Sequence, residues 1–180
     1  MDLQSLAKNI KLVAFDVDGV LTDGSLTFDE NGVEYKTFNA KDGQGIVMLN
    51  KTGFITAIIT ARKNGTVRHR FSNLGMTKLF EGQKDKLAAL DELCEEFNVT
   101  YDEIAYMGDD LPDICVLQKV GLSACPADAV DEVRACSKMI SAKNGGRGAV
   151  RELCDLILYA QNKNPFINNV DTSGVAIDRH

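Results

Sequence analysis

Two aspartates, separated by a single residue, follow the first apolar run of the chain. Asp16 and Asp18 follow residues 11–15, and Gly19 comes next. Side chains two positions apart leave an extended strand on the same face, so both carboxylates can converge on one point. Gly19 allows the backbone to turn sharply beside them. The spacing therefore predicts a pair of acids held together at the end of a strand.

A second acidic cluster, made of Asp109, Asp110 and Asp113, follows the apolar run of residues 104–107. If both runs are neighbouring strands of a parallel sheet, their carboxyl ends lie side by side. Several carboxylates would then crowd together, which is costly unless a cation compensates their charge. Mg²⁺ takes hard oxygen ligands of this kind, together with phosphate oxygens and water. The two clusters therefore predict a magnesium site that receives a phosphate group.

Each of these aspartates could by itself be a turn former or a helix cap. Two clusters at the ends of two apolar strands are harder to explain in that way. Thr60 ends the apolar run of residues 54–59, and its hydroxyl could bind a phosphate oxygen. Lys86 begins an amphipathic helical pattern. Alone, the threonine would be an ordinary strand-end residue and the lysine a solvated one, so the prediction depends on the whole set.

Apolar runs and amphipathic patterns alternate along most of the chain, which indicates βαβ units. We predict an α/β fold with a doubly wound, Rossmann-like parallel sheet, in which ligands bind beyond the carboxyl ends of the strands. We expect Asp42 to cap a helix. We expect no cap at Thr100 and Glu103, because the apolar run after them leads straight into a strand. The expected strands are residues 11–15, 54–59, 79–81, 104–107, 122–124 and 138–140. The expected helices are residues 42–51, 64–73, 84–98 and 149–161, and another helix is expected with Pro112 in its first turn.

A β-hairpin flap is predicted over about residues 25–39, with its turn at residues 29–32 and apolar residues on both arms. A lone two-stranded hairpin is marginal in water and leaves its edges open for pairing. We expect hairpins of neighbouring subunits to bury one another in a homotetramer. The alternative is that the hairpin folds back on its own domain.

Composition and charge narrow the classes of partner. The formal net charge is -6 and the isoelectric point is about 4.9, so we expect neither nucleic acid nor membrane as a partner. The five cysteines form no CxxC pair, which favours reduced thiols in the cytoplasm over disulfides or a zinc site. The last segment, residues 162–180, is rich in Asn, Asp and Ser, and we expect a flexible tail that either stays mobile or docks on a neighbouring subunit.

Four motifs occur in a fixed order: a DxDGxLT loop at residues 16–22, Thr60 after an apolar strand, Lys86, and a GDxxxD loop at residues 108–113. On these motifs the chain resembles the haloacid dehalogenase superfamily, and the resemblance extends to about Gln161. The ordered set is highly specific, whereas the DxD pair alone would be weak. The resemblance implies a phosphatase domain over residues 1–161. No separate cap domain fits between the motifs, so the site of a single chain should be open.

The resemblance also implies roles for the residues. Asp16 is the expected nucleophile that forms an aspartyl-phosphate, and Asp18 is the expected general acid and base. Mg²⁺ is expected on Asp16, on the backbone carbonyl of Asp18 and on Asp109. Thr60 and Lys86 are expected to hold phosphate oxygens.

Two more acids are expected to support this site. Asp113 would orient Lys86 or the waters of the metal, and Asp110 belongs to the same supporting loop. Lys84 is a nearby competitor for the lysine role. Lys86 is preferred because its neighbourhood, GQxxKL, is closer to the family pattern.

Three runs, at residues 42–46, 108–113 and 145–152, are similar to a capless, tetrameric branch that hydrolyses an eight-carbon sugar-acid phosphate in bacterial lipopolysaccharide synthesis. Phosphatases of nine-carbon, sialic-type sugar acids share most of these features and stay an alternative. The chain departs from the pattern at Thr60-Ala61-Arg62, where relatives often have Ser-Gly-Arg. The candidate cations for a sugar acid are Arg62 and Arg147, with Lys63, Arg68 and Arg151 as weaker candidates.

Two readings from other functional classes remain open at this point. One is a receiver-type signalling module, which also holds an aspartyl-phosphate with Asp, Thr and Lys on a parallel sheet. The other is a non-catalytic partner protein on a decayed phosphatase fold. Asp18 argues against the first, because a receiver has no general acid there. The filled catalytic positions argue against the second.

Overall fold

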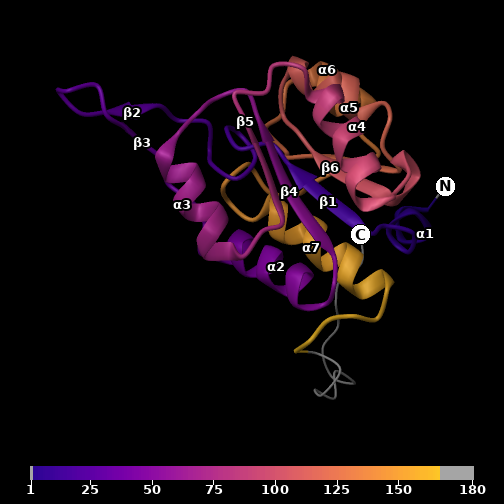
Figure 1. The fold of residues 1–180 in the computed structure, drawn as a ribbon. Helices are drawn as coiled ribbons and strands as arrows, with labels where there is room; N and C mark the ends of the chain where they lie inside the picture. Colours follow the sequence, from indigo (N-terminus) through magenta and orange to yellow (C-terminus); the bar gives the residue numbers. More distant parts are fainter. Residues whose placement is uncertain (1, 167–180) are drawn as a thin grey trace.

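The computed structural model describes residues 2–166, which form a six-stranded parallel sheet between two layers of helices (Figure 1). The strand order is β5-β4-β1-β6-β7-β8, and every neighbouring pair is parallel. The predicted doubly wound sheet is therefore confirmed. The strands are β1 (Leu12–Phe15), β4 (Ile55–Thr60), β5 (Lys78–Glu81), β6 (Ile104–Met107), β7 (Leu122–Cys125) and β8 (Met139–Ile140).

The helices divide between the two faces of the sheet. On one face, the core contains residues of α1 (Leu3–Ala7), α2 (Ala40–Lys51), α3 (Gly65–Leu74) and α7 (Ala149–Ala160). On the other face it contains residues of α4 (Lys86–Phe97), α5 (Ile114–Leu117) and α6 (Asp131–Cys136). The short helices α1 and α6 were not anticipated from the sequence.

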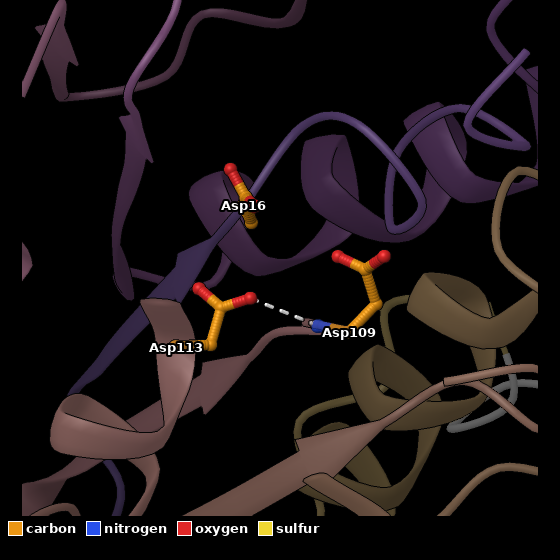
Figure 2. Close-up of side chains that lie close together, drawn as sticks. All are labelled: Asp16, Asp109 and Asp113. Carbon is orange, nitrogen blue, oxygen red and sulfur yellow. Dashed lines mark hydrogen bonds between the residues drawn. The ribbon is translucent and has the colours of Figure 1, made fainter. Parts of the chain in front are cut away.

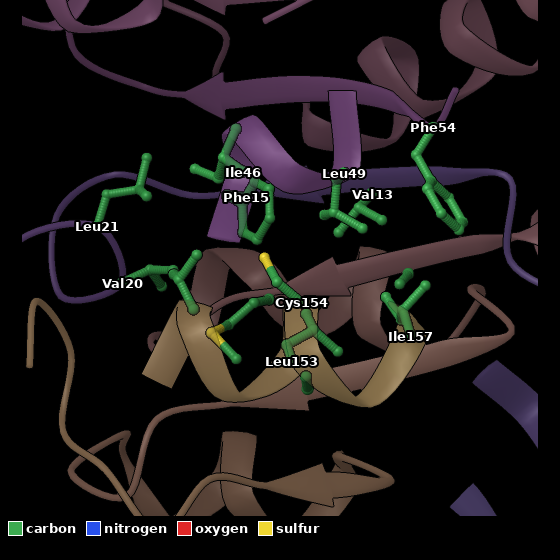
Figure 3. Packing of buried hydrophobic residues seen from close by; sticks show 14 of the residues in the cluster. Val13, Phe15, Val20, Leu21, Ile46, Leu49, Phe54, Leu153, Cys154 and Ile157 are labelled. Atoms are coloured by element: carbon green, nitrogen blue, oxygen red, sulfur yellow. The ribbon is translucent and has the colours of Figure 1, made fainter. Parts of the chain in front are cut away.

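The central position of β1 in the sheet explains why its sequence is apolar without interruption. Val13 and Phe15 point into the core beneath α2 and α7, whereas Leu12 and Ala14 point to the opposite core (Figure 3). All four are completely buried. A central strand with helices on both faces needs apolar side chains at every position, because successive side chains alternate between the faces.

The hairpin of β2 (Thr27–Phe28) and β3 (Glu34–Tyr35) extends away from the sheet (Figure 1). Asp29 organises its turn, since its Oδ1 accepts hydrogen bonds from the backbone N–H groups of Asn31 at 2.9 Å and Val33 at 2.8 Å. The hairpin does not fold back on its own domain. More than half of each of four apolar side chains is exposed there, namely Leu26, Phe28, Val33 and Tyr35.

The predicted cap at Asp42 is wrong. Asn39 caps α2, because its Oδ1 accepts a hydrogen bond from Lys41 N at 2.8 Å. Asp42 instead lies buried in the first turn of α2 and accepts bonds from the backbone N–H groups of Gly148 at 3.1 Å and Arg151 at 2.8 Å. It therefore satisfies free N–H groups at the start of α7, a helix more than a hundred residues later.

The predicted absence of a cap at Thr100 is also wrong. Glu103 Oε2 accepts a hydrogen bond from Thr100 N at 3.0 Å, and the pair forms a capping box. A single 3₁₀ turn, Tyr101–Glu103, fits between this cap and β6. The cap and the strand are compatible because one short turn needs only three residues.

Within residues 2–166 no cap domain is inserted between the strands. None of the helices in this described part is long and apolar enough to cross a membrane. The prediction of a flexible tail over residues 162–180 lies outside the described residues from 167 onward.

We predict that Asp42→Ala destabilises the fold by about 1–3 kcal/mol, because buried backbone donors at the start of α7 lose their acceptor. Asp42→Asn should cost less, since the amide oxygen still accepts one bond. Urea unfolding measures both changes. Lys41→Ala, at an exposed neighbour on the same helix, is the matched control and should stay within about 0.5 kcal/mol. An unchanged unfolding midpoint for Asp42→Ala would show that Asp42 does not support α7.

Candidate active site

The site lies at the carboxyl ends of three adjacent strands. Strand β1 pairs with β4 on one side and with β6 on the other, with Phe15 opposite Ile58 and Met107. Asp16 follows β1, Thr60 ends β4, and Asp109 follows β6 shortly after. All three line one pocket of about 290 Å³. The parallel pairing thus gathers residues that are more than forty positions apart in sequence.

Three carboxylates meet in this pocket. Oxygens of Asp16, Asp109 and Asp113 all lie within 4.8 Å of one another (Figure 2). Asp113 is completely buried, and its Oδ2 accepts hydrogen bonds from the backbone N–H groups of Asp109 at 3.0 Å and Asp110 at 3.2 Å. Asp113 therefore fixes the loop that carries Asp109 next to Asp16.

Lys86 is the buried cation of the site. Its side chain is 3% exposed, and its Nζ lies 2.9 Å from Asp16 Oδ2 and 2.6 Å from Asp113 Oδ1. The Tyr106 hydroxyl also donates to Asp113 Oδ1, at 2.6 Å. Both oxygens of Asp113 are thus occupied by protein donors. Lys84, the competitor considered from the sequence, is exposed and does not line the pocket.

Burial and mutual repulsion change the acidity of these groups. Burial raises the pKa of the Asp16 carboxyl to about 6, although the Lys86 ammonium acts in the opposite direction. Burial, followed by the charges of Asp16 and Asp113, raises the pKa of the Asp109 carboxyl to about 8. Burial lowers the pKa of Lys86, but the same two carboxylates outweigh it, so the net pKa is raised and the amine stays protonated. One lysine therefore compensates three carboxylates only in part.

Gly19 lets the loop of residues 16–22 approach Asp109 closely. Its φ angle is 81°, and a Cβ at this position would lie 1.9 Å from Asp109 Oδ2. The Oδ1 atom of Asp109 is buried and makes no hydrogen bond to any described residue. A buried carboxylate oxygen without a donor is costly unless a cation or water binds it. This oxygen points to a cation site between Asp109 and Asp16.

Asp18 lies in the pocket but outside the three-carboxylate cluster. Its Oδ1 accepts a hydrogen bond from the ammonium group of Lys36, at the base of the hairpin. Lys36 also lies 3.0 Å from Glu34 Oε1, and its own side chain is only 1% exposed. Sequence analysis missed Lys36. The one available signal was its place two residues after Glu34, which puts both side chains on the same side of an extended arm.

Arg62 and Thr60 also line the pocket. Thr60 is buried, and its Oγ1 accepts a hydrogen bond from Arg62 N at 3.3 Å. The Arg62 guanidinium is 42% exposed and lies 3.4 Å from Glu34 Oε1, a contact too long for a strong hydrogen bond. A pocket-lining cation held this loosely is free to meet an anionic ligand.

The other candidate cations are not among the residues that line this pocket, and three of them pair with acids elsewhere. A contact between Arg147 and a ligand at the acid cluster stays a prediction, since Arg147 is not among the residues that line the pocket. The pairs are Arg68 with Glu81 at 2.6 Å, Arg147 with Asp23 at 3.0 Å, and Arg151 with Asp155 at 2.8 Å. The remaining candidate, Lys63, lies beside Gly82.

A larger hollow of about 720 Å³ lies at the opposite, amino-terminal edge of the sheet, beside Lys11, Ile55 and Glu103. Lys11 and Glu103 form an ion pair at 2.5 Å there. Ligands of open α/β sheets bind at the other edge, beyond the carboxyl ends of the strands. The smaller pocket, which holds the carboxylate cluster and the buried lysine, is therefore the candidate active site.

Comparison with known proteins agrees with this geometry. Residues 63–153 match the family described as haloacid dehalogenase-like hydrolase. The chain is 45% identical over 162 residues to the 3-deoxy-D-manno-octulosonate 8-phosphate phosphatase of Escherichia coli K12. This alignment covers 90% of this chain and 86% of that enzyme.

Solved structures show the same relationship. The crystal structure of the enzyme of this name from Yersinia pestis matches with a TM-score of 0.88 and 43% identity, over 89% of this chain and 87% of the other. The Moraxella catarrhalis structure, in complex with a magnesium ion, a phosphate ion and a KDO molecule, matches with a TM-score of 0.87 and 42% identity, over 89% and 92% of the two chains. The chain belongs to the haloacid dehalogenase-like hydrolases.

Proposed function

We propose that the protein is a magnesium-dependent phosphatase that hydrolyses 3-deoxy-D-manno-octulosonate 8-phosphate to the free sugar acid and phosphate, in lipopolysaccharide precursor synthesis. The observation that carries the proposal is the contact of Asp16 with buried Lys86 beside the unsatisfied oxygen of Asp109. This arrangement supplies a nucleophile, a cation for phosphate and a place for a metal. The high identity to phosphatases of this name supports the choice of substrate.

The residues present fit Mg²⁺. Asp16 and Asp109 offer hard carboxylate oxygens within 4.8 Å of each other, and Asp109 Oδ1 has no hydrogen-bond partner among the described residues. Asp113 is a poor third ligand, because protein donors occupy both of its oxygens. We propose the backbone carbonyl of Asp18 as the third protein ligand. When bound, the ion supplies positive charge that lowers repulsion between the phosphate dianion and Asp16.

The protein's own groups account for both steps of the reaction. The Asp16 carboxylate attacks phosphorus, a phosphorus–oxygen bond forms to Asp16, and the bond to the sugar oxygen breaks. Asp18 gives a proton to that leaving oxygen. Asp18 then takes a proton from the water that hydrolyses the aspartyl-phosphate. Lys86 and the Thr60 hydroxyl hold the transferring phosphoryl oxygens as their charge shifts.

The proposed substrate carries a carboxylate as well as a phosphate. Arg62 is the pocket-lining cation that pairs with none of the three clustered carboxylates and that contacts Glu34 only at 3.4 Å. We therefore propose Arg62 as the contact for the sugar acid. A nine-carbon, sialic-type sugar acid phosphate satisfies the same contact and is the alternative substrate.

The assembly proposed is a homotetramer in the cytoplasm. Four half-exposed apolar side chains on the hairpin, Leu26, Phe28, Val33 and Tyr35, support contacts between subunits, because a two-stranded hairpin alone is marginal. Such contacts would bring a neighbour over a site that lacks its own cap. The five free thiols support a reducing compartment.

We predict that the wild-type protein with Mg²⁺ releases phosphate faster from the eight-carbon sugar-acid phosphate than from nine-carbon or neutral sugar phosphates. Asp16→Asn should lower turnover by several orders of magnitude, because an amide is a far poorer nucleophile. Asp131→Asn is the matched control, since that side chain is 97% exposed and does not line the pocket. Near-normal phosphate release by folded Asp16→Asn would refute the mechanism.

We predict that the protein without divalent cations loses stability as the pH rises from about 5 to about 8. Folding raises the pKa of Asp16 from 3.8 to about 6 and that of Asp109 from 3.8 to about 8, so the folded state binds more protons in this range. Stabilisation by Mg²⁺ should grow over the same range, because the metal needs deprotonated ligands. Thermal unfolding in chelator and in Mg²⁺ measures both trends. Asp109→Asn should weaken the pH dependence of stability in chelator and of the stabilisation by Mg²⁺. A stabilisation by Mg²⁺ that does not change with pH would contradict the proposal that Asp16 and Asp109 bind the metal.

We predict that light scattering finds a tetramer for the wild-type protein. The double substitution Phe28→Asp and Tyr35→Asp should dissociate it, because charges would replace apolar groups at the proposed contact. Tyr159→Asp is the matched control, as another exposed aromatic residue that lies on α7. A stable, fully active wild-type monomer would remove the basis for shared closure of the site.

A further inference from the structure

We propose that Lys36 is a positioning residue that holds the carboxyl group of Asp18 toward the leaving group of the substrate. The proposal rests on the proposed function, in which Asp18 is the proton donor. Lys36 is neither a metal ligand nor a residue of the sequence motifs. It comes from the base of the hairpin, yet its ammonium contacts Asp18 directly.

The position of Lys36 is strongly constrained. Its side chain is 1% exposed, and such a charge is tolerated only with well-placed partners. Asp18 is one partner, and Glu34 Oε1, at 3.0 Å, is the other. Glu34 is held in turn, since its Oε2 accepts a hydrogen bond from Asn64 Nδ2 at 3.2 Å. The ammonium group therefore lies between two carboxylates, with a hydrogen bond to Asp18 and an ion pair, but no hydrogen bond, to Glu34 Oε1. This placement restricts the position of Asp18.

The contact draws Asp18 away from the other acids. Asp16 and Asp109 lie together with Asp113, whereas Asp18 is outside this group and faces the hairpin. In phosphoryl transfer the attacking and leaving oxygens lie roughly in line on opposite sides of phosphorus. A proton donor to the leaving oxygen must therefore lie on the side of phosphorus opposite the nucleophile. Lys36 keeps Asp18 on that side.

The contact also leaves one oxygen of Asp18 free for the proton. Lys36 donates to Oδ1, so Oδ2 can carry the proton that passes to the sugar oxygen when its bond to phosphorus breaks. In the second step Asp18 takes a proton back from water. In this proposal Lys36 exchanges no proton with the substrate, so it acts only through the orientation of Asp18.

The test compares two substrates that differ in their need for a proton donor. The leaving group of p-nitrophenyl phosphate departs without protonation, whereas a sugar alkoxide requires it. With full-length protein and Mg²⁺, Lys36→Met should lower kcat/KM for the sugar-acid phosphate by about 10- to 100-fold, part of the usual contribution of a general acid. The loss on the aryl phosphate should be several times smaller. Lys36→Arg should recover part of the sugar-phosphate activity, and Lys41→Met, at an exposed lysine, is the matched control.

A double-substitution cycle with Asp18→Asn completes the test. Because Lys36 acts through Asp18, Lys36→Met should lower kcat/KM no further in the Asp18→Asn protein. Equal losses on both substrates, or full additivity with Asp18→Asn, would overturn the proposal. If the Lys36→Met protein does not unfold cooperatively, Lys36→Gln replaces it and kcat/KM is compared on the same two substrates. Absence of turnover by wild-type protein on either substrate would reject the proposed function instead.

Discussion

Repulsion between buried carboxylates at the carboxyl edge of the sheet governs the layout of this site. Asp16, Asp109 and Asp113 approach within 4.8 Å, and burial raises the pKa of the first two. Asp113 is compensated by Lys86, by the Tyr106 hydroxyl and by backbone N–H groups of its own loop. The pair Asp16 and Asp109 is compensated only in part, because Asp16 shares its one lysine with Asp113 and Asp109 Oδ1 has no hydrogen-bond partner among the described residues. The positive charge that this pair lacks is the charge that a metal ion provides.

The loop that carries Asp16 and Asp18 is held in place by segments distant in sequence. A Cβ at Gly145 would lie 1.7 Å from Gly19 O, so the loop before α7 packs directly against this loop. Asp42 then joins α2 to the start of α7 through two backbone hydrogen bonds. These contacts explain the glycine-rich run before α7 physically, because any side chain at Gly145 would displace the loop beneath it.

The hairpin carries two kinds of side chain close together. Phe28 and Tyr35 expose apolar surface, whereas Glu34 and Lys36, on either side of Tyr35, form a charged pair next to Asp18. A contact made by Tyr35 would thereby lie one residue from the lysine that contacts Asp18. The hairpin is thus part of the candidate active site as well as the surface proposed for association.

The sequence alone determined the α/β class, the parallel sheet and the strand ends that carry Asp16 and Asp109, because period and strand-end position are local properties of the chain. It did not predict that Asp42 would cap α7 or that Lys36 would contact Asp18. Local spacing describes neighbours along one element, but both contacts join elements whose relative positions are set by packing. Only the tertiary structure, which buries these charges and demands a partner for each, decided where they bond.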